Sequence, residues 1–215
     1  MSAAAANPRR ILRVRVWDPF VRIFHWTVVT GVLIAYFTED WRPVHKLVGY
    51  VVLVMVTLRI VWGFLGPRHA RFSDFVRGPR EVLAHVRDLL RGREPPSVGH
   101  NPLGGMMVVA LLTTLLVICV SGWMMTLDAF WGDERVEELH ESAVNVLLGL
   151  VGLHVAGVVF TSLREGVNLV KAMFTGTKEF EVEDPEEERA ILAQAAEGAI
   201  ETIPMSQQRE APART

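Results

Sequence analysis

The hydrophobic residues of this chain are gathered in four long runs separated by polar segments. The runs cover approximately residues 20–37, 44–64, 103–125 and 136–163. Each is close to the ~20 residues that a helix needs to cross a hydrocarbon core about 30 Å thick. Backbone groups in lipid have to be bonded within their own segment, so runs of this length predict helices rather than strands. The sequence therefore predicts an all-α, integral membrane bundle of four helices.

The first run is expected to be a retained helix and not a cleaved signal peptide. It is a full span, and it ends at the polar segment 38–41 without a small-residue cleavage site. Pro19 and Pro43 suit the first turns of the first two helices, where the missing N–H costs nothing. Gly66 and Pro67 are expected to end the second helix.

Basic residues are distributed unequally between the two sides of the predicted bundle. Fourteen Lys and Arg residues flank the spans on one side, and two lie on the other. The fourteen are Arg9, Arg10, Arg13, Arg15, Arg68, Arg71, Arg77, Arg80, Arg87, Arg91, Arg93, Arg164, Lys171 and Lys178; the two are Arg42 and Arg135. The positive-inside rule then predicts that both termini lie in the cytoplasm.

The segments outside the spans divide the chain into three predicted parts. Residues 1–16 form a cytoplasmic N-terminal arm, 17–178 the four-helix domain and 179–215 an acidic cytoplasmic tail. The tail is expected to be disordered apart from one weak helix around residues 191–200. Residues 79–90 place apolar side chains near one helical face, which predicts a short amphipathic helix at the cytoplasmic surface or capping the bundle.

Four of the seven histidines lie inside predicted spans, where an ionisable side chain is costly and points to function. His140 and His154 are separated by close to four whole helical turns, so they share a face of the fourth helix. Because successive spans run in opposite directions, His25 lies at the inner depth of His154. His45 likewise lies at the outer depth of His140. The depths predict two facing pairs.

Two facing imidazoles are the axial ligands of a six-coordinate, low-spin haem iron, which passes electrons without offering a site to a substrate. Zinc is the alternative, but it prefers more ligands, and no carboxylate or thiolate in the spans is placed to supply them. The single cysteine, Cys119, excludes an intrachain disulfide and the paired-cysteine motif of covalent haem. We therefore predict two non-covalent b-type haems.

The anionic haem propionates require cations or hydrogen-bond donors. Arg59 follows His45 by close to four helical turns, so it shares that face at the depth of the inner haem, and Arg22 lies near the same site. Lys46 lies near the outer site. The alternative for each is to extend to the interface, which we favour for Lys46. His69, His85 and His100 fall in the basic connection and are expected to be solvated. The quinone pocket is not located by the sequence, although His100, Asn101 and Arg59 are weak candidates.

Several short motifs resemble the bacterial cytochrome b561 family, which includes the cytochrome b subunits of nickel–iron hydrogenases. They are residues 16–26 (VWDPFVRIFHW), 45–50 (HKLVGY), 59–68 (RIVWGFLGPR), 99–102 (GHNP), 139–141 (LHE) and 153–154 (LH). The resemblance covers about residues 14–176. It implies a four-helix di-haem module with His25, His45, His140 and His154 as ligands, exchanging electrons with the quinone pool. Hydrogenase subunits of the family tend to have a longer loop between the first two spans, so the short segment 38–41 favours the shorter type.

The leading functional hypothesis is an electron-transfer cytochrome of a respiratory chain. It connects the quinone pool to a redox protein, for which a periplasmic cytochrome, a dehydrogenase and a hydrogenase are the candidates. An electron carrier or oxidoreductase subunit is favoured over a stand-alone enzyme. One rival is a superoxide:ubiquinone oxidoreductase, but its outer face would need a cationic funnel and this one is acidic. The other rival is a membrane anchor subunit of a hydrogenase or dehydrogenase in which haem is incidental.

Overall fold

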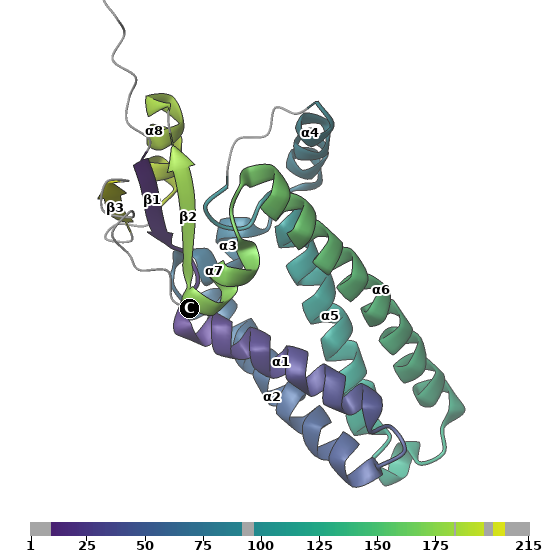
Figure 1. Ribbon diagram of the computed structural model, residues 1–215. Coiled ribbons are helices and arrows are strands. Elements are labelled where there is room, and N and C mark those ends of the chain that lie inside the picture. The colour runs from purple at the N-terminus through teal and green to yellow at the C-terminus, as the bar shows by residue number, and fades with distance from the viewer. Residues whose placement is uncertain (1–9, 92–96, 183, 196–199, 205–215) are drawn as a thin grey trace, which may run out of the picture.

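The computed structural model describes residues 10–91, 97–182, 184–195 and 200–204, and four long helices dominate it (Figure 1). They are α1 (Pro19–Phe37), α2 (Arg42–Leu65), α5 (Pro102–Met124) and α6 (Glu134–Glu165). Each is long and apolar enough to cross a membrane. The predicted all-α membrane bundle is confirmed, and the chain is a multi-pass membrane protein.

Local sequence fixes where the long helices begin. The side chain of Asp18 accepts hydrogen bonds from the backbone N–H groups of Phe20 and Val21, at 2.9 and 3.2 Å, and so caps α1. Asn101 caps α5 by accepting from the N–H of Gly104 at 2.7 Å. These side chains satisfy N–H groups that have no partner within the first turn of a helix.

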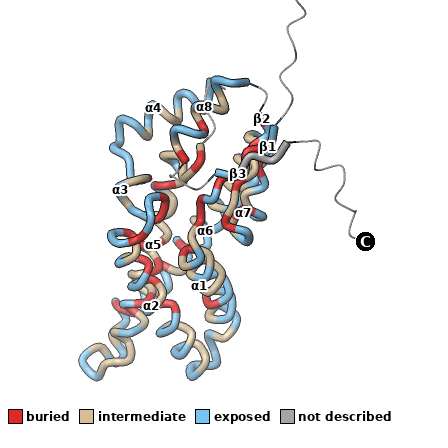
Figure 2. The backbone as a smooth tube through the Cα atoms, turned by 90° about the vertical axis from the view of Figure 1, so that its left-hand side faces the viewer, coloured by how far each residue is buried: buried red, intermediate tan, exposed pale blue. Residues whose placement is uncertain are grey.

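The helices pack in chain order, α1 on α2, α2 on α5 and α5 on α6, and α6 faces α1 across a wider separation (Figure 1). At Gly31 a Cβ atom would lie 2.7 Å from the Cγ2 of Val52, so a glycine is needed where α1 and α2 approach. The buried core runs through the centre of the bundle (Figure 2) and consists of Val28, Val52, Val56, Leu112, Leu115, Cys119 and Leu147. Large apolar side chains on the opposite faces are exposed, as expected for lipid contact.

A three-stranded antiparallel sheet joins the two ends of the chain at one end of the bundle. Strand β1 (Arg10–Arg15) lies between β2 (Thr177–Val182) and β3 (Ile200–Pro204), with Leu12 opposite Phe180. The helices α7 (Leu169–Thr175) and α8 (Pro185–Gln194) flank β2 in sequence. We call this end of the bundle the sheet end. The opposite end, with the connections at residues 38–41 and 125–133, is the loop end.

The sheet corrects the prediction for the tail. Residues 179–215 were expected to be disordered, and this is wrong for 179–182, 185–194 and 200–204, which form strand and helix. Leu12 and Val14 lie on either side of Arg13 on β1, and their buried side chains pack with Phe180 and Val182 of β2. The acidic residues around this segment hid its period-two pattern. The predicted weak helix lies instead at Pro185–Gln194, and residues 183, 196–199 and 205–215 lie outside the described residues.

Short helices complete the connections. They are η1 (Arg68–Ala70), α3 (Phe72–Phe75), α4 (Pro79–Leu90) and η2 (Asp128–Phe130). The predicted amphipathic helix is confirmed as α4, whose Leu83 and Leu90 are exposed. It contacts the first part of α5 at the sheet end.

Lys178 ties the sheet to the connection before α5. Its side chain is 2% exposed, and its Nζ donates to the carbonyl oxygens of Ser97 at 2.8 Å and Gly99 at 3.4 Å. Burial lowers the pKa of Lys178 to about 8, against the opposing effect of Glu165. The strand therefore holds the backbone that leads into His100.

Glu179 generates a prediction for the stability of the sheet. Its carboxylate accepts from Arg13 Nη2 at 3.0 Å and Lys171 Nζ at 2.7 Å, and these bonds lower the pKa of Glu179, the Lys171 bond most. The stabilisation is present above the carboxyl's unfolded pKa and lost as pH falls through the lowered folded value. For partly exposed pairs, Glu179→Gln should cost about 0.5–1 kcal/mol at pH 7.

Hydrogen exchange of the β1–β2 amides measures this effect, with Glu186→Gln on the exposed surface of α8 as the control. Equal protection in Glu179→Gln and the control at pH 7 would contradict the assignment.

Candidate functional site

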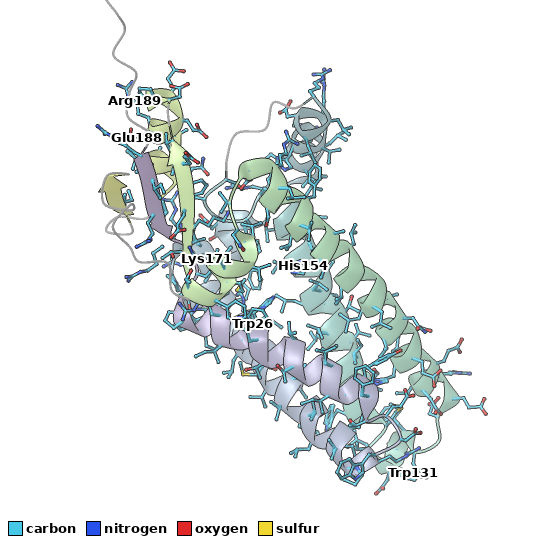
Figure 3. All side chains as sticks on the ribbon, viewed as in Figure 1. Trp26, Trp131, His154, Lys171, Glu188 and Arg189 are labelled. Atoms are coloured by element: carbon cyan, nitrogen blue, oxygen red, sulfur yellow. The ribbon has the colours of Figure 1, made fainter. Side chains whose placement is uncertain are left out.

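The four histidines of the long helices form two facing pairs. The ring centroids of His25 on α1 and His154 on α6 are 6.5 Å apart, and those of His45 on α2 and His140 on α6 are 6.2 Å apart. The first pair lies toward the sheet end and the second at the loop end. Figure 3 shows His154 on the side of α6 that faces α1. The structure thus brings these residues together in the combinations that their depths predict.

The spacing within each pair matches coordination of one metal by both rings. A metal–imidazole bond of about 2 Å on either side, plus the half-width of each ring, gives a centroid separation of roughly 6 Å. Rings in direct contact would lie closer. In the described residues, no group of three or more His, Cys, Asp or Glu side chains is placed to hold a metal ion. The two-histidine pairs are therefore the metal-binding candidates, and they fit an iron porphyrin better than zinc.

Backbone carbonyls orient both imidazoles of the loop-end pair. The Nδ1 of His45 lies 2.9 Å from the carbonyl oxygen of Ala35. The Nδ1 of His140 lies 3.0 Å from the carbonyl oxygen of Ile118 and 3.1 Å from the Oγ of Ser121. A carbonyl can only accept, so both Nδ1 atoms carry the proton. This leaves the Nε2 lone pair of each ring for a metal.

Small residues on the supporting helices leave space beside these rings. At Gly122 of α5 a Cβ atom would lie 3.1 Å from the Cε1 of His140, so a larger residue would displace the ring. Gly49 follows His45 by about one turn, and a Cβ atom there would meet nothing within 4 Å. Open space beside His45 is what a flat macrocycle requires.

The sheet-end pair has a different environment. The Nδ1 of His25 is buried without a hydrogen-bond partner among the described residues, as is the Nε1 of Trp26. Trp26 lies edge-on to His25 at 4.9 Å and stacks on Phe174 of α7 at 4.1 Å. Helix α7 therefore covers the ring neighbouring His25.

The predicted propionate partners differ in how they are placed. Arg59 is 3% exposed, its Cζ lies 5.5 Å from the Phe72 ring centroid, and its Nη1 has no partner among the described residues. Arg22 donates through Nη1 to the carbonyl oxygen of Thr175 at 2.8 Å, while its Nε is buried without a described partner. Lys46 is exposed, in line with an interfacial position. Arg59 is therefore the buried cation available to an anionic ligand.

Two histidines that were expected to be solvated pack against the protein instead, and this expectation was wrong: His69 is buried and His100 is half-buried. His69 is 7% exposed, and its Nδ1 lies 3.0 Å from the Oδ2 of Asp74. The ring of His100 lies 4.6 Å from that of Trp17 and 4.9 Å from that of Phe75. Burial, aided by the nearby charges of Lys178 and Arg59, lowers the pKa of His100 to about 3. His85, on α4, is partly exposed.

Comparison with known proteins gives one matching family and relatives that share a single name. The family model described as prokaryotic cytochrome b561 matches residues 16–176. A Rhodobacter capsulatus protein named probable Ni/Fe-hydrogenase B-type cytochrome subunit is 24% identical over 80% of this chain and 84% of its own length. A Bradyrhizobium diazoefficiens protein of the same name is also 24% identical, over 84% of this chain and 92% of its own length.

Gly122 provides a test of the loop-end geometry. Gly122→Leu should displace the His140 ring and remove the predicted haem of the loop-end pair, because the new side chain needs the space that the ring occupies. Haem content per chain, measured on purified protein, should fall by about half. Gly78→Leu, at the exposed start of α4, is the matched control and should retain the full content. Full haem content in Gly122→Leu would contradict the prediction.

Proposed function

The chain belongs to the prokaryotic cytochrome b561 family, and on that premise we propose that it is a di-haem cytochrome connecting the quinone pool to a redox partner protein. Family and relatives make it a membrane haem b electron-transfer protein. The proposal adds the number of haems, their ligands and the quinone. Its main support is the presence of two histidine pairs, each with the ring separation that a bis-histidine iron requires.

Each pair has a defined role in this proposal. His25 and His154 hold one haem b toward the sheet end, and His45 and His140 hold the other at the loop end. Bound there, haem b would supply a reversible one-electron iron couple without an open coordination position. The carbonyls of Ala35 and Ile118 fix the tautomer of the loop-end rings, and hydrogen bonds of this kind raise the basicity of a metal ligand.

The two pairs are placed for transfer across the bilayer. The two histidines of α6 are close to four turns apart, which corresponds to roughly 21 Å along the helix axis. Leu147 lies midway between them and packs with Val28 and Val52 in the apolar core. This layer excludes water between the sites, so electrons rather than protons cross it.

Arg59 is the residue that we assign to a propionate of the sheet-end haem. A guanidinium buried in a membrane helix requires an anionic or hydrogen-bonding partner, and the Nη1 of Arg59 has none among the described residues. Arg22 is the second candidate, although its Nη1 is already engaged by the carbonyl of Thr175. Each would orient the macrocycle and offset the charge of its carboxylate.

The distribution of charge supports a cytoplasmic sheet end in the bacterial inner membrane. Of the basic residues counted by the positive-inside rule, those that the structure describes flank the sheet end, including those of β1, α4 and α7. The loop end carries exposed Glu39, Asp40, Asp128 and Glu134, with Arg42, Lys46 and Arg135 as the cations nearby. Trp131 lies at the loop end in Figure 3, where an interfacial aromatic is expected.

The names of the relatives favour a hydrogenase as the redox partner, with another dehydrogenase or a periplasmic cytochrome as alternatives. A superoxide:ubiquinone oxidoreductase is less well supported, because an acidic loop end repels an anionic substrate. An anchor subunit with incidental haem does not account for two oriented histidine pairs.

Paired substitutions test the ligand assignment. His45→Ala and His140→Ala should each lose the same single haem, and His25→Ala and His154→Ala the other, because a bis-histidine site fails when either ligand is removed. The double variant His45→Ala/His140→Ala should lose no more haem than either single variant. In contrast, His25→Ala/His45→Ala should lose both.

Reduced-minus-oxidised spectra and haem content per purified chain measure these losses, and His85→Ala serves as the control that retains both haems. A within-pair double variant that loses both haems would contradict the pairing.

A further inference from the structure

Buried polar atoms without a partner are confined to one end of this molecule. In the described parts of the chain, every buried side-chain nitrogen or oxygen that lacks a hydrogen bond lies in the sheet-end half. At the loop end, by contrast, the Nδ1 atoms of His45 and His140 are both bonded. Beyond the residues next to His25, the atoms at the sheet end are Arg59 Nη1, Trp62 Nε1, His69 Nε2 and His100 Nδ1. Such atoms are costly to bury, so a polar ligand is expected at this end.

The chemistry of these atoms distinguishes between ligands. Arg59 and Trp62 present N–H groups, which can only donate. His69 differs, because its Nδ1 donates to the Oδ2 of Asp74 at 3.0 Å and leaves an accepting lone pair on Nε2. A carboxylate, such as a haem propionate, supplies acceptors only and cannot satisfy that lone pair. A quinol supplies both, since its hydroxyl groups donate and its oxygens accept.

His69 and Asp74 also connect the interior to water. His69 is 7% exposed, whereas the side chain of Asp74 is 21% exposed and its Oδ1 lies 3.4 Å from the Nε of Arg68. Arg68 is 54% exposed. A proton received at the buried Nε2 therefore has a path through the ring to a carboxylate at the surface.

The backbone before α5 holds this pair in place. At Gly99 a Cβ atom would lie 3.2 Å from the Nδ1 of His69 and 3.6 Å from the Oδ2 of Asp74, so glycine lets the pair lie against the chain. The carbonyl of Gly99 accepts from Lys178. The next residue, His100, is within electrostatic range of both His69 and the haem-ligand candidate His154. The pair thus lies at the same end of the bundle as the His25–His154 site.

We propose that His69, paired with Asp74, accepts the hydroxyl protons of a quinol bound at the sheet end. The inference rests on the proposed function, because it requires the two haem sites and a quinone substrate. Oxidation of one quinol to quinone releases two electrons and two protons. The haems that the two histidine pairs would hold would supply the acceptors for these electrons, one electron for each haem. Each proton goes to the Nε2 of His69 while the Nδ1 proton moves to Asp74 and then to water. The ring has to return to its Nδ1–H form before it takes the second proton of the same quinol. Quinone reduction follows the same path in reverse.

Charged groups from several elements lie around His69. Asp74 on α3 contacts His69, and Arg68 on η1 contacts Asp74. His100 precedes α5, and the charges of Arg59 on α2 and Lys178 on β2 act on His100.

The test compares a reductant that carries protons with one that does not. Full-length protein in lipid nanodiscs is mixed rapidly and anaerobically with a short-chain ubiquinol or with dithionite, and the haem absorption is followed. General-base catalysis contributes about 10²–10⁴-fold to a rate. His69→Gln should therefore slow reduction by quinol at least tenfold while leaving the rate and extent of reduction by dithionite unchanged. The control His85→Gln on α4 should behave like the unaltered protein.

Asp74→Asn tests the second member of the pair. It should give a smaller loss in the quinol rate, with the pH profile of that rate displaced to lower pH, because a carboxylate beside an imidazole favours its protonated form. Dithionite reduction should again be unchanged. A purely structural role for Asp74 would not displace the pH profile.

The outcomes separate the two proposals. If dithionite but not quinol reduces the unaltered protein, the quinone function fails, and the role of His69 fails with it. If quinol reduces His69→Gln as fast as the unaltered protein, the role of His69 alone is overturned. Should His69→Gln lose the sheet-end haem spectrum, Asp74→Asn decides, and an unchanged quinol rate and pH profile in that variant overturn the proposal.

Discussion

Imidazole rings buried among membrane helices impose the main physical constraint on this structure. An ionisable ring in hydrocarbon is costly unless its nitrogen atoms are bonded. At the loop end, His45 and His140 bond their Nδ1 atoms to backbone carbonyls, which leaves the Nε2 lone pair of each ring for another partner. Two lone pairs cannot satisfy one another. An electron-pair acceptor between the rings resolves the conflict, and ring centroids 6.2 Å apart leave the space for a metal. This requirement explains why α6 stands apart from α1 while packing closely on α5.

The two ends of the bundle carry different chemical groups. The loop end has bonded imidazoles, short connections and an acidic surface, and it resembles a site that only passes electrons. The sheet end combines a buried guanidinium, a histidine paired with a carboxylate and a sheet that fixes the intervening backbone through Lys178. Groups that can donate or accept hydrogen bonds are therefore concentrated at one end. We attribute this asymmetry to a division between electron exchange with a protein and proton-coupled exchange with a quinone.

Much of this arrangement could be predicted from the sequence. The helical repeat and the depth of a residue in the membrane can both be worked out for each helix separately. The length of each apolar run gave the spans, and the four-turn spacing on α6 gave the pairing of the histidines. The sheet could not be predicted in the same way. Strand β1 pairs with segments from the opposite end of the chain. Its own pattern is too short to predict a strand, and the acidic residues of the tail favoured disorder. The burial of His69 was missed for a related reason. It depends on how the connection that carries His69 packs against Gly99. The count of basic residues had suggested only that this connection lies in water.

The stoichiometry of haem in the purified chain tests the central claim most directly. Quantification of extracted haem against protein, combined with electron paramagnetic resonance of the oxidised form, reports both the number of sites and their ligation. The account predicts two b-type haems per chain, both low-spin, as two nitrogen ligands from facing histidines require. One haem per chain, or a substantial high-spin signal from a site with an open coordination position, would contradict it.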